Sequence, residues 1–158
     1  MTINTKIKPA KRWDFRDLAK WILTEYYNHP EVTLNIMYND AVCDHFSTED
    51  IKIDAILDKL SIPHNYNLII REYADLKTII PHEMIHLHQY EIEDLKVNKF
   101  ENQIVFNYKG KEYDPSTPYE DRPWENEAHE LDDKLYRLYK KQKKEAKYLV
   151  SFFYSSQT

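Results

Sequence analysis

His82, Glu83 and His86 form the pattern HExxH, which has the residue types and the spacing of a metal-activated hydrolase. On a helix, positions i and i+4 lie one above the other, so the two imidazoles would reach one ion. Neutral imidazole is a good ligand for Zn²⁺. Glu83 follows His82 directly and is placed to take a proton from a water that the metal activates. The pattern therefore predicts a site for one catalytic zinc ion, with Glu83 as general base.

A catalytic zinc site needs a third protein ligand and one open position. A metzincin would have a third histidine six residues after His86, but Ile92 stands there, so this class is excluded. His88 comes two residues after His86 and would turn to roughly the opposite side of the helix, so we expect it at the surface or behind the ligands. The remaining source is the segment PWENEAHE, which supplies Glu125 and Glu127.

These two carboxylates compete for the third position. At about 100° per residue, Glu127 lies nearer than Glu125 to the apolar stripe of the last predicted helix. The helix dipole also favours a carboxylate in a first turn without any metal. The residues alone leave three interpretations open: Glu125, Glu127 or neither.

HExxH followed by a glutamate on a later helix resembles the gluzincins. The run from Glu125 to His129 (ENEAH) is similar to the E-x-x-A-D/N segment of several of them, including neprilysin-like peptidases and the small peptidases of mobile elements. The order of motifs over about residues 65–139 looks like small phage-encoded metallopeptidase-like proteins. The resemblance implies that Glu125 binds zinc and that His129, in place of the usual Asp or Asn, supports a metal-binding histidine. It also implies a compact zincin-like domain in which a C-terminal helix supplies the glutamate ligand.

Attack on a peptide carbonyl creates an oxyanion, which zinc usually shares with one further donor. The candidate donors are Tyr113, Tyr119, Arg122, His129 and Tyr136. In the peptidases that the chain resembles, an extended substrate often pairs with a sheet edge beside the metal-binding helix. The strand Leu68–Arg71 is the predicted edge. The expected partner is a peptide or protein substrate.

The elements that must position these residues are predicted from periodicity and from turn signals, and they give an α+β domain. Pro81 is expected to kink the HExxH helix or to mark its start. We predict a single domain over residues 1–158, with a loose arm at 1–10 and a tail at 147–158. The expected elements are a helix over 13–27, a strand over 32–38, a helix starting at 47–50 and reaching 60, a strand over 66–71, a helix over 73–91, a hairpin over 103–113 and a last helix from 123.

Composition limits the function. The chain has 158 residues with 42% hydrophobic content, which suits one domain with a modest core. Its net charge of −5 makes nucleic acid an unlikely partner and gives no reason to expect a membrane. Cys43 is the single cysteine, which fits a reducing compartment. No apolar run is long enough for a membrane span or a signal sequence, so we expect the cytoplasm, that of the host if a phage encodes the chain.

The single glycine, Gly110, excludes phosphate-binding loops and dinucleotide fingerprints. The leading hypothesis is a zinc metallopeptidase. The first alternative is a catalytically silent zinc-binding protein that acts as a phage accessory or interaction factor. A further alternative is a DNA-associated regulator in which HExxH arises by chance.

Overall fold

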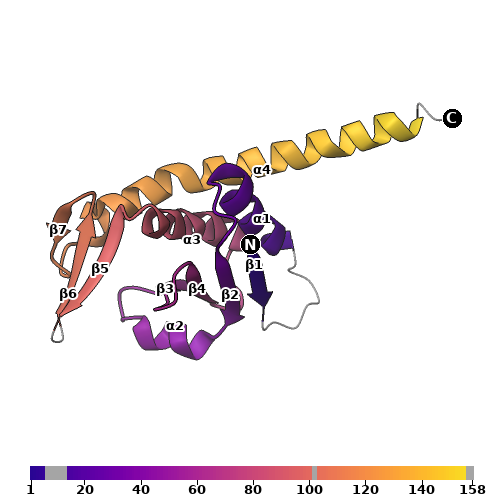
Figure 1. Ribbon diagram of the computed structural model, residues 1–158. Coiled ribbons are helices and arrows are strands. Elements are labelled where there is room, and N and C mark those ends of the chain that lie inside the picture. Colours follow the sequence, from indigo (N-terminus) through magenta and orange to yellow (C-terminus); the bar gives the residue numbers. More distant parts are fainter. Residues whose placement is uncertain (6–13, 101–102, 156–158) are drawn as a thin grey trace.

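The computed structural model describes residues 1–5, 14–100 and 103–155 (Figure 1). These residues form an α+β fold with two small sheets, which confirms the predicted class. The strands are β1 (Thr2–Thr5), β2 (Thr33–Tyr38), β3 (Ala55–Lys59), β4 (Asn65–Ile70), β5 (Leu95–Phe100), β6 (Gln103–Tyr108) and β7 (Lys111–Tyr113). The helices are α1 (Asp14–Trp21) with its π-helical continuation η1 (Ile22–Tyr26), α2 (Asp40–Phe46), α3 (Leu76–Glu91), the short 3-10 helix η2 (Tyr119–Asp121) and α4 (Pro123–Ser155).

The larger sheet has the strand order β1-β2-β4-β3. β1, β2 and β4 run parallel, and β3 pairs antiparallel with β4. Alternate residues of the two central strands are buried, as the period of a strand requires: Leu34 and Ile36 on β2, and Tyr66, Leu68 and Ile70 on β4. These side chains share one core with buried residues of α1, η1, α3 and α4. The core therefore holds α3 against the sheet.

α3 carries HExxH on a helix, as predicted. The side chain of Asp75 caps its start by accepting a hydrogen bond from the backbone N–H of Lys77 at 3.2 Å. Pro81 lies inside the helix and is buried, so it does not mark the start of α3. The other buried side chains of α3 include Ile80, Met84, Ile85 and Leu87, which belong to the main core. This packing fixes the rotation of the helix and hence the direction of its histidines.

The smaller sheet consists of β5, β6 and β7 in antiparallel order. Lys109 and Gly110 form the turn of the predicted hairpin, and both have positive φ, 49° and 82°, as a two-residue hairpin turn requires. β5 was not predicted. Tyr108 and Leu95 of this sheet form a second buried cluster with Trp124, the second residue of α4. The sheet thus anchors the start of the last helix.

α4 crosses the main body and then extends beyond it (Figure 1). Ala128, Leu135 and Tyr139 are buried in the main core, where α4 packs against α3. Residues 147–155, which we expected as a tail, continue this helix to Ser155. At the other terminus, Thr2–Thr5 form β1 and pair with β2, although we expected a loose arm; the rest of that arm lies outside the described residues.

The helix predicted from residue 47 to residue 60 is wrong. α2 ends before this segment, and Ser47 closes it: its backbone N–H bonds the carbonyls of Cys43 and Asp44. The Ser47 hydroxyl donates to the Cys43 carbonyl at 2.8 Å and accepts from the backbone N–H of Ile53 at 2.9 Å. Such local bonds offer the backbone an alternative to a helix. Two of the apolar residues that suggested a helix, Ile56 and Leu57, instead lie in β3, where Leu57 packs on the core.

The expected edge strand is also corrected. β4, which contains Leu68–Ile70, lies between β2 and β3, so its backbone is paired on both sides. Among the described strands of this sheet, β3 is the edge on that side, and it contacts α3. Sequence periodicity could not show this, because it does not reveal which strands are neighbours.

Candidate metal centre

His82 and His86 on α3 and Glu125 on α4 converge on one point. Nε2 of His82 lies 3.1 Å from Nε2 of His86, and Oε2 of Glu125 lies 3.2 Å and 3.1 Å from these two nitrogen atoms. The three side chains are mostly buried, with exposed fractions of 12%, 11% and 13%. They form one of the three groups among the described residues whose atoms could share a metal ion.

The two helices explain this convergence. His82 and His86 are one turn apart on α3, so their rings project from the same face. Glu125 lies in the first turn of α4, and the neighbouring Trp124 is packed between Phe106, Tyr108 and Tyr113 of the smaller sheet. The anchored start of α4 therefore sets the position of the carboxylate. The positive end of the helix dipole also favours a negative charge there.

The triangle of donor atoms has the size of one face of a zinc tetrahedron. Zn–N and Zn–O bonds of about 2.0–2.1 Å at tetrahedral angles place two ligand atoms about 3.3–3.4 Å apart. The observed separations of 3.1–3.2 Å are close to this value. Two imidazole nitrogens and one carboxylate oxygen also form a donor set that zinc accepts, with a fourth position left for water or substrate.

Hydrogen bonds alone satisfy this group poorly. Nδ1 of His86 lies 2.8 Å from Oε1 of Gln89, and an amide oxygen can only accept, so the proton of a neutral His86 belongs on Nδ1. Its Nε2 lone pair then faces another imidazole nitrogen and a carboxylate oxygen. Burial lowers the pKa of His86, but Glu125 more than offsets this and the pKa rises to about 9. Without a metal, His86 therefore carries a second proton at neutral pH, and this positive charge lies beside the Glu125 carboxylate where a cation would bind.

Glu125 is held ionised. Burial raises the pKa of this carboxyl group, but the hydrogen bonds with His82, His86 and Tyr119 and the charge of His86 together outweigh burial, and the pKa lies well below its usual range. A carboxylate that is charged at neutral pH is ready to bind a cation. The electrostatics of the group therefore suit a metal ligand.

His82 has a carboxylate behind it. Its Nδ1 is buried without a hydrogen-bond partner and lies 3.6 Å from Oδ2 of Asp132. A carboxylate behind a metal-binding imidazole is a common way of orienting the ring. Asp132 also lies 3.5 Å from Nδ1 of His129, whose ring is 4.6 Å from that of His82. His129, the expected support, is thus beside His82, but the carboxylate behind that ring comes from Asp132.

Asp132 and Gln89 were not among the predicted site residues. Gln89 is almost fully buried, and its Nε2 donates to the Trp124 carbonyl at 3.1 Å and to Oε2 of Glu127 at 2.7 Å. Helical spacing could have indicated both residues, because Gln89 follows His86 by three positions and Asp132 follows Glu125 by seven. Neither residue type is specific enough to be chosen without knowing that the two helices meet.

Glu127, the alternative ligand, turns to a different set of partners. Its carboxylate accepts from Gln89, from the Tyr108 hydroxyl at 2.7 Å and from Lys109 Nζ at 3.2 Å. Burial raises the pKa of Glu127, but these donors hold the net pKa below its usual range. Glu125, not Glu127, therefore lies in the group with the two histidines.

Glu83 lies beside this group. Burial raises the pKa of its carboxyl group, although His86 and His82 act in the opposite direction. A raised pKa makes a carboxylate a stronger base. The environment of Glu83 is therefore compatible with the expected role of proton acceptor.

Of the expected oxyanion donors, Tyr119 and His129 are near the three-residue group. Oη of Tyr119 lies 3.0 Å from Nε2 of His129. Burial and a hydrogen bond with Glu125 raise the pKa of Tyr119, so its hydroxyl stays protonated at neutral pH. Tyr136 instead packs against the main core.

The other two candidates have structural contacts. The guanidinium of Arg122 donates to the backbone carbonyls of Thr117 and Pro115 at 3.0 Å and 3.3 Å. Tyr113 makes an edge contact with Trp124 in the second buried cluster, with ring centres 5.4 Å apart. Both residues shape the loop and the sheet that precede α4.

His88 belongs to a separate cluster. Its ring stacks on Tyr27 at 3.7 Å, and its Nδ1 lies 2.8 Å from Nε2 of His29. Burial lowers the pKa of His88 to about 4, which keeps the ring neutral. His29 forms a further possible metal-binding group with Glu31 and Glu91, but Glu91 is already held by hydrogen bonds from two other side chains.

Searches among models of protein families, curated proteins and solved structures found no match for this chain. Within the described residues, no helix combines the length and the apolar character that crossing a membrane requires. The functional interpretation therefore rests on the geometry and the chemistry of the residues themselves.

Proposed function

We propose that this chain is a zinc-dependent metallopeptidase with a compact, gluzincin-like domain. One observation carries the proposal: His82 Nε2, His86 Nε2 and Glu125 Oε2 form a triangle with sides of 3.1–3.2 Å. These are the residues that HExxH and the later glutamate would supply. The triangle has the size that a tetrahedral zinc ion needs, and an ion held by three ligands keeps a fourth position for water or substrate.

The surrounding residues prepare these ligands for zinc. The Gln89 side-chain oxygen accepts a hydrogen bond from Nδ1–H of His86, so that Nε2 can bind a metal. Asp132 lies behind His82 and favours the corresponding tautomer of that ring. Bound zinc would lower the pKa of a water molecule and polarise the carbonyl of a peptide bond.

The remaining chemistry falls to side chains of this chain. Glu83 takes a proton from the attacking water and transfers it to the leaving amine, which is general base and then general acid catalysis. Tyr119 keeps its proton and can donate a hydrogen bond to the oxyanion. His129 positions this hydroxyl at 3.0 Å. The proposed reaction is the hydrolysis of a peptide bond.

An extended peptide would bind along β3. Among the described strands, this one pairs with β4 alone, and it contacts α3, which carries the histidines. The free edge of a strand can pair with a peptide backbone, and the side-chain pockets then select the sequence. β3 thus takes the role that the sequence had suggested for residues 68–71.

Zinc content and peptide cleavage test the proposal together. The protein is purified in the presence of zinc, desalted and assayed for metal and for cleavage of a mixed peptide library. We expect about one equivalent of zinc and cleavage that stops when a chelator is added. Less than about one-tenth of an equivalent would overturn the zinc site. One equivalent without cleavage of any peptide would instead support the catalytically silent alternative.

A further inference from the structure

The last part of α4 leaves the body of the protein. Tyr139 is the last buried residue on the helix, and every residue from Lys140 to Ser155 is exposed. Gln142 and Lys143 still contact Trp21 and Asp17 of α1. The helix then continues for another twelve residues, which is roughly 18 Å at the rise of an α-helix. Figure 1 shows this end of the helix standing away from both sheets.

The end of this helix, Tyr148–Ser155, is rich in large apolar side chains, and we call it the apolar tip. Phe152 is 68% exposed, and Tyr148 and Leu149 are almost as exposed. The other exposed apolar residues of the tip are Val150, Phe153 and Tyr154. At about 100° per residue, these six side chains cover roughly 240° of the helix circumference. An exposed apolar surface of this extent indicates a binding surface.

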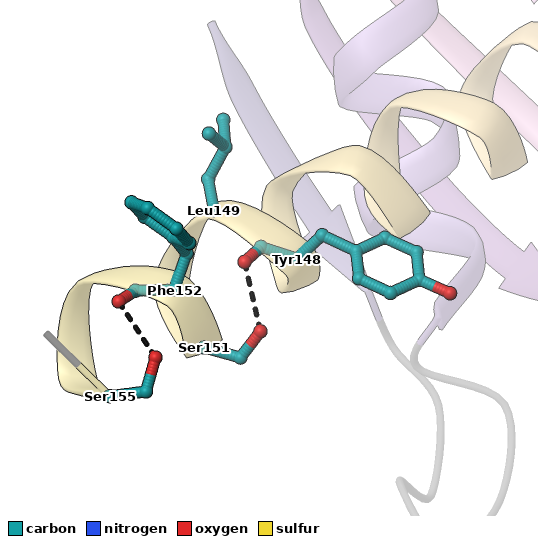
Figure 2. A pocket seen from close by; sticks show the side chains of 5 residues that line it. All are labelled: Tyr148, Leu149, Ser151, Phe152 and Ser155. Carbon is teal, nitrogen blue, oxygen red and sulfur yellow. Dashed lines mark hydrogen bonds between the residues drawn. The ribbon is translucent and has the colours of Figure 1, made fainter.

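Figure 2 shows a shallow pocket on the tip, lined by Tyr148, Leu149, Ser151, Phe152 and Ser155. Of these residues, Ser151 and Ser155 lie outside the apolar arc, on the rest of the circumference. Their hydroxyl groups donate to the carbonyls of Tyr148 and Phe152 at 2.8 Å and 3.0 Å. Because these polar groups are bonded within the helix, the tip can enter an apolar environment without leaving the serine hydroxyls unsatisfied.

A strongly basic segment precedes the tip. From residue 134 to the C-terminus the chain has seven Lys or Arg residues and a single acidic residue, Glu145, although the whole chain has a net charge of −5. Five lysines lie between positions 140 and 147. Nζ of Lys144 lies 6.0 Å from the centre of the Tyr148 ring, so positive charge and apolar surface adjoin each other. The net charge of the whole chain is negative and therefore does not reveal that positive charge is concentrated in this segment.

We infer that the end of α4 docks the protein on an anionic lipid surface. The apolar tip enters the interface, and the lysines before it bind the acidic headgroups. The large side chains span six residue steps, or about 9 Å of helix, and apolar side chains of interfacial helices enter the boundary between headgroups and acyl chains. Clusters of four to eight basic residues beside such a helix are typical of anionic lipid binding.

Lipid fits this surface better than a protein partner does. A groove on a folded protein covers one face of a helix, whereas the apolar arc here covers most of the circumference. Parallel pairing with a second copy would place the two lysine clusters side by side, where they repel each other. A fluid apolar layer surrounds the tip and leaves the lysines at the headgroups.

Vesicle binding tests this inference with the full chain. We would compare co-flotation with vesicles of phosphatidylcholine alone and with vesicles that also contain phosphatidylglycerol. We expect binding to the anionic vesicles that falls at least tenfold when the salt concentration rises from 50 mM to 500 mM. L149Q/F152Q removes apolar surface, and K140Q/K141Q/K144Q/K147Q removes charge but leaves the Lys143–Asp17 pair; each should weaken binding at least tenfold.

Matched variants control for composition. I62Q/I104Q removes two exposed apolar residues elsewhere, and K20Q/K59Q/K77Q/K111Q removes four exposed lysines elsewhere; both should bind vesicles normally. Equal binding to neutral vesicles, or no binding to anionic ones, would overturn the inference. Self-association in light scattering without lipid, lost in L149Q/F152Q and accompanied by no vesicle binding, would assign the tip to a second copy instead. Zinc content should be unchanged in all four variants, which separates this test from that of the peptidase.

Discussion

The carboxamide oxygen of Gln89 lies 2.8 Å from Nδ1 of His86, and through this contact one buried residue orients an imidazole of the candidate metal centre. The same amide donates to α4 at the Trp124 carbonyl and at Glu127. Gln89 therefore links the helix that carries the histidines to the helix that carries Glu125. Its role can be tested separately from that of the ligands.

Gln89→Leu should lower zinc affinity by about 10–100-fold, because partners behind metal-binding histidines typically have effects of this size. The measurement is competition with a chromophoric chelator, together with circular dichroism to check the fold. Gln103→Leu, at an exposed position in β6, is the matched control and should leave affinity unchanged. Unchanged affinity in a folded Gln89→Leu protein would show that Gln89 does not orient the ligand.

Two glutamates two residues apart provide a paired test of the third ligand. Glu125→Gln removes the carboxylate that contacts both histidines, and we expect a loss of zinc affinity beyond the 100-fold that outer partners reach. Glu127→Gln removes a carboxylate bound to Gln89, Tyr108 and Lys109, and affinity should fall by less than about tenfold. Equal zinc affinity in the two variants would contradict the assignment of Glu125.

The sequence predicted the local part of this centre and missed the part that depends on packing. His82 and His86 share a face because helix geometry alone places i and i+4 together. The choice between Glu125 and Glu127 stayed open, because it depends on how α4 is rotated against α3. The structure settles that rotation through Trp124, which packs into the smaller sheet. That contact joins α4 to a sheet whose first strand was not predicted.

The same difference between local signals and packing explains the errors in the predicted fold. α3 and the hairpin at Lys109–Gly110 have strong local signals in the sequence, a helical apolar pattern in one case and a Lys-Gly pair between two strand-like runs in the other. The segment from Ser47 to Leu60 has apolar residues whose spacing fits a helix and a strand about equally well. Residues 55–59 form a strand because they pair with β4. A short window of sequence does not show which segments pair with each other.

Glu83→Gln separates metal binding from turnover. The amide keeps the shape of the side chain but cannot accept a proton, so we expect full zinc content and a loss of at least about 100-fold in the cleavage rate. Metal analysis and peptide cleavage are measured on the same sample. Glu112→Gln, which removes an exposed carboxylate on β7, is the control for the loss of one negative charge. Cleavage that survives in Glu83→Gln would exclude Glu83 as the base.

Acid stability should depend on Glu91 at the end of α3. Its carboxylate lies 2.6 Å from both the Tyr66 hydroxyl and Nδ1 of His64. Burial raises the pKa of Glu91, but these hydrogen bonds more than offset this, and the net pKa is lowered. A lowered pKa in the folded state means that the contribution to stability is complete above the unfolded value of about 4.3 and is lost as the pH falls through the folded value.

Glu91→Gln removes this titration. The melting temperature of the original protein should therefore fall more steeply than that of the variant between about pH 5 and pH 3, and the difference between the two should be largest at neutral pH. Thermal unfolding followed by circular dichroism at a series of pH values measures both curves. Glu93→Gln, at a position that is exposed and bonded to Lys96, is the neighbouring control. Parallel curves for the original protein and Glu91→Gln would contradict this prediction. They would show that the ionised carboxylate, which accepts hydrogen bonds from Tyr66 and His64, does not stabilise the junction of α3 with β4.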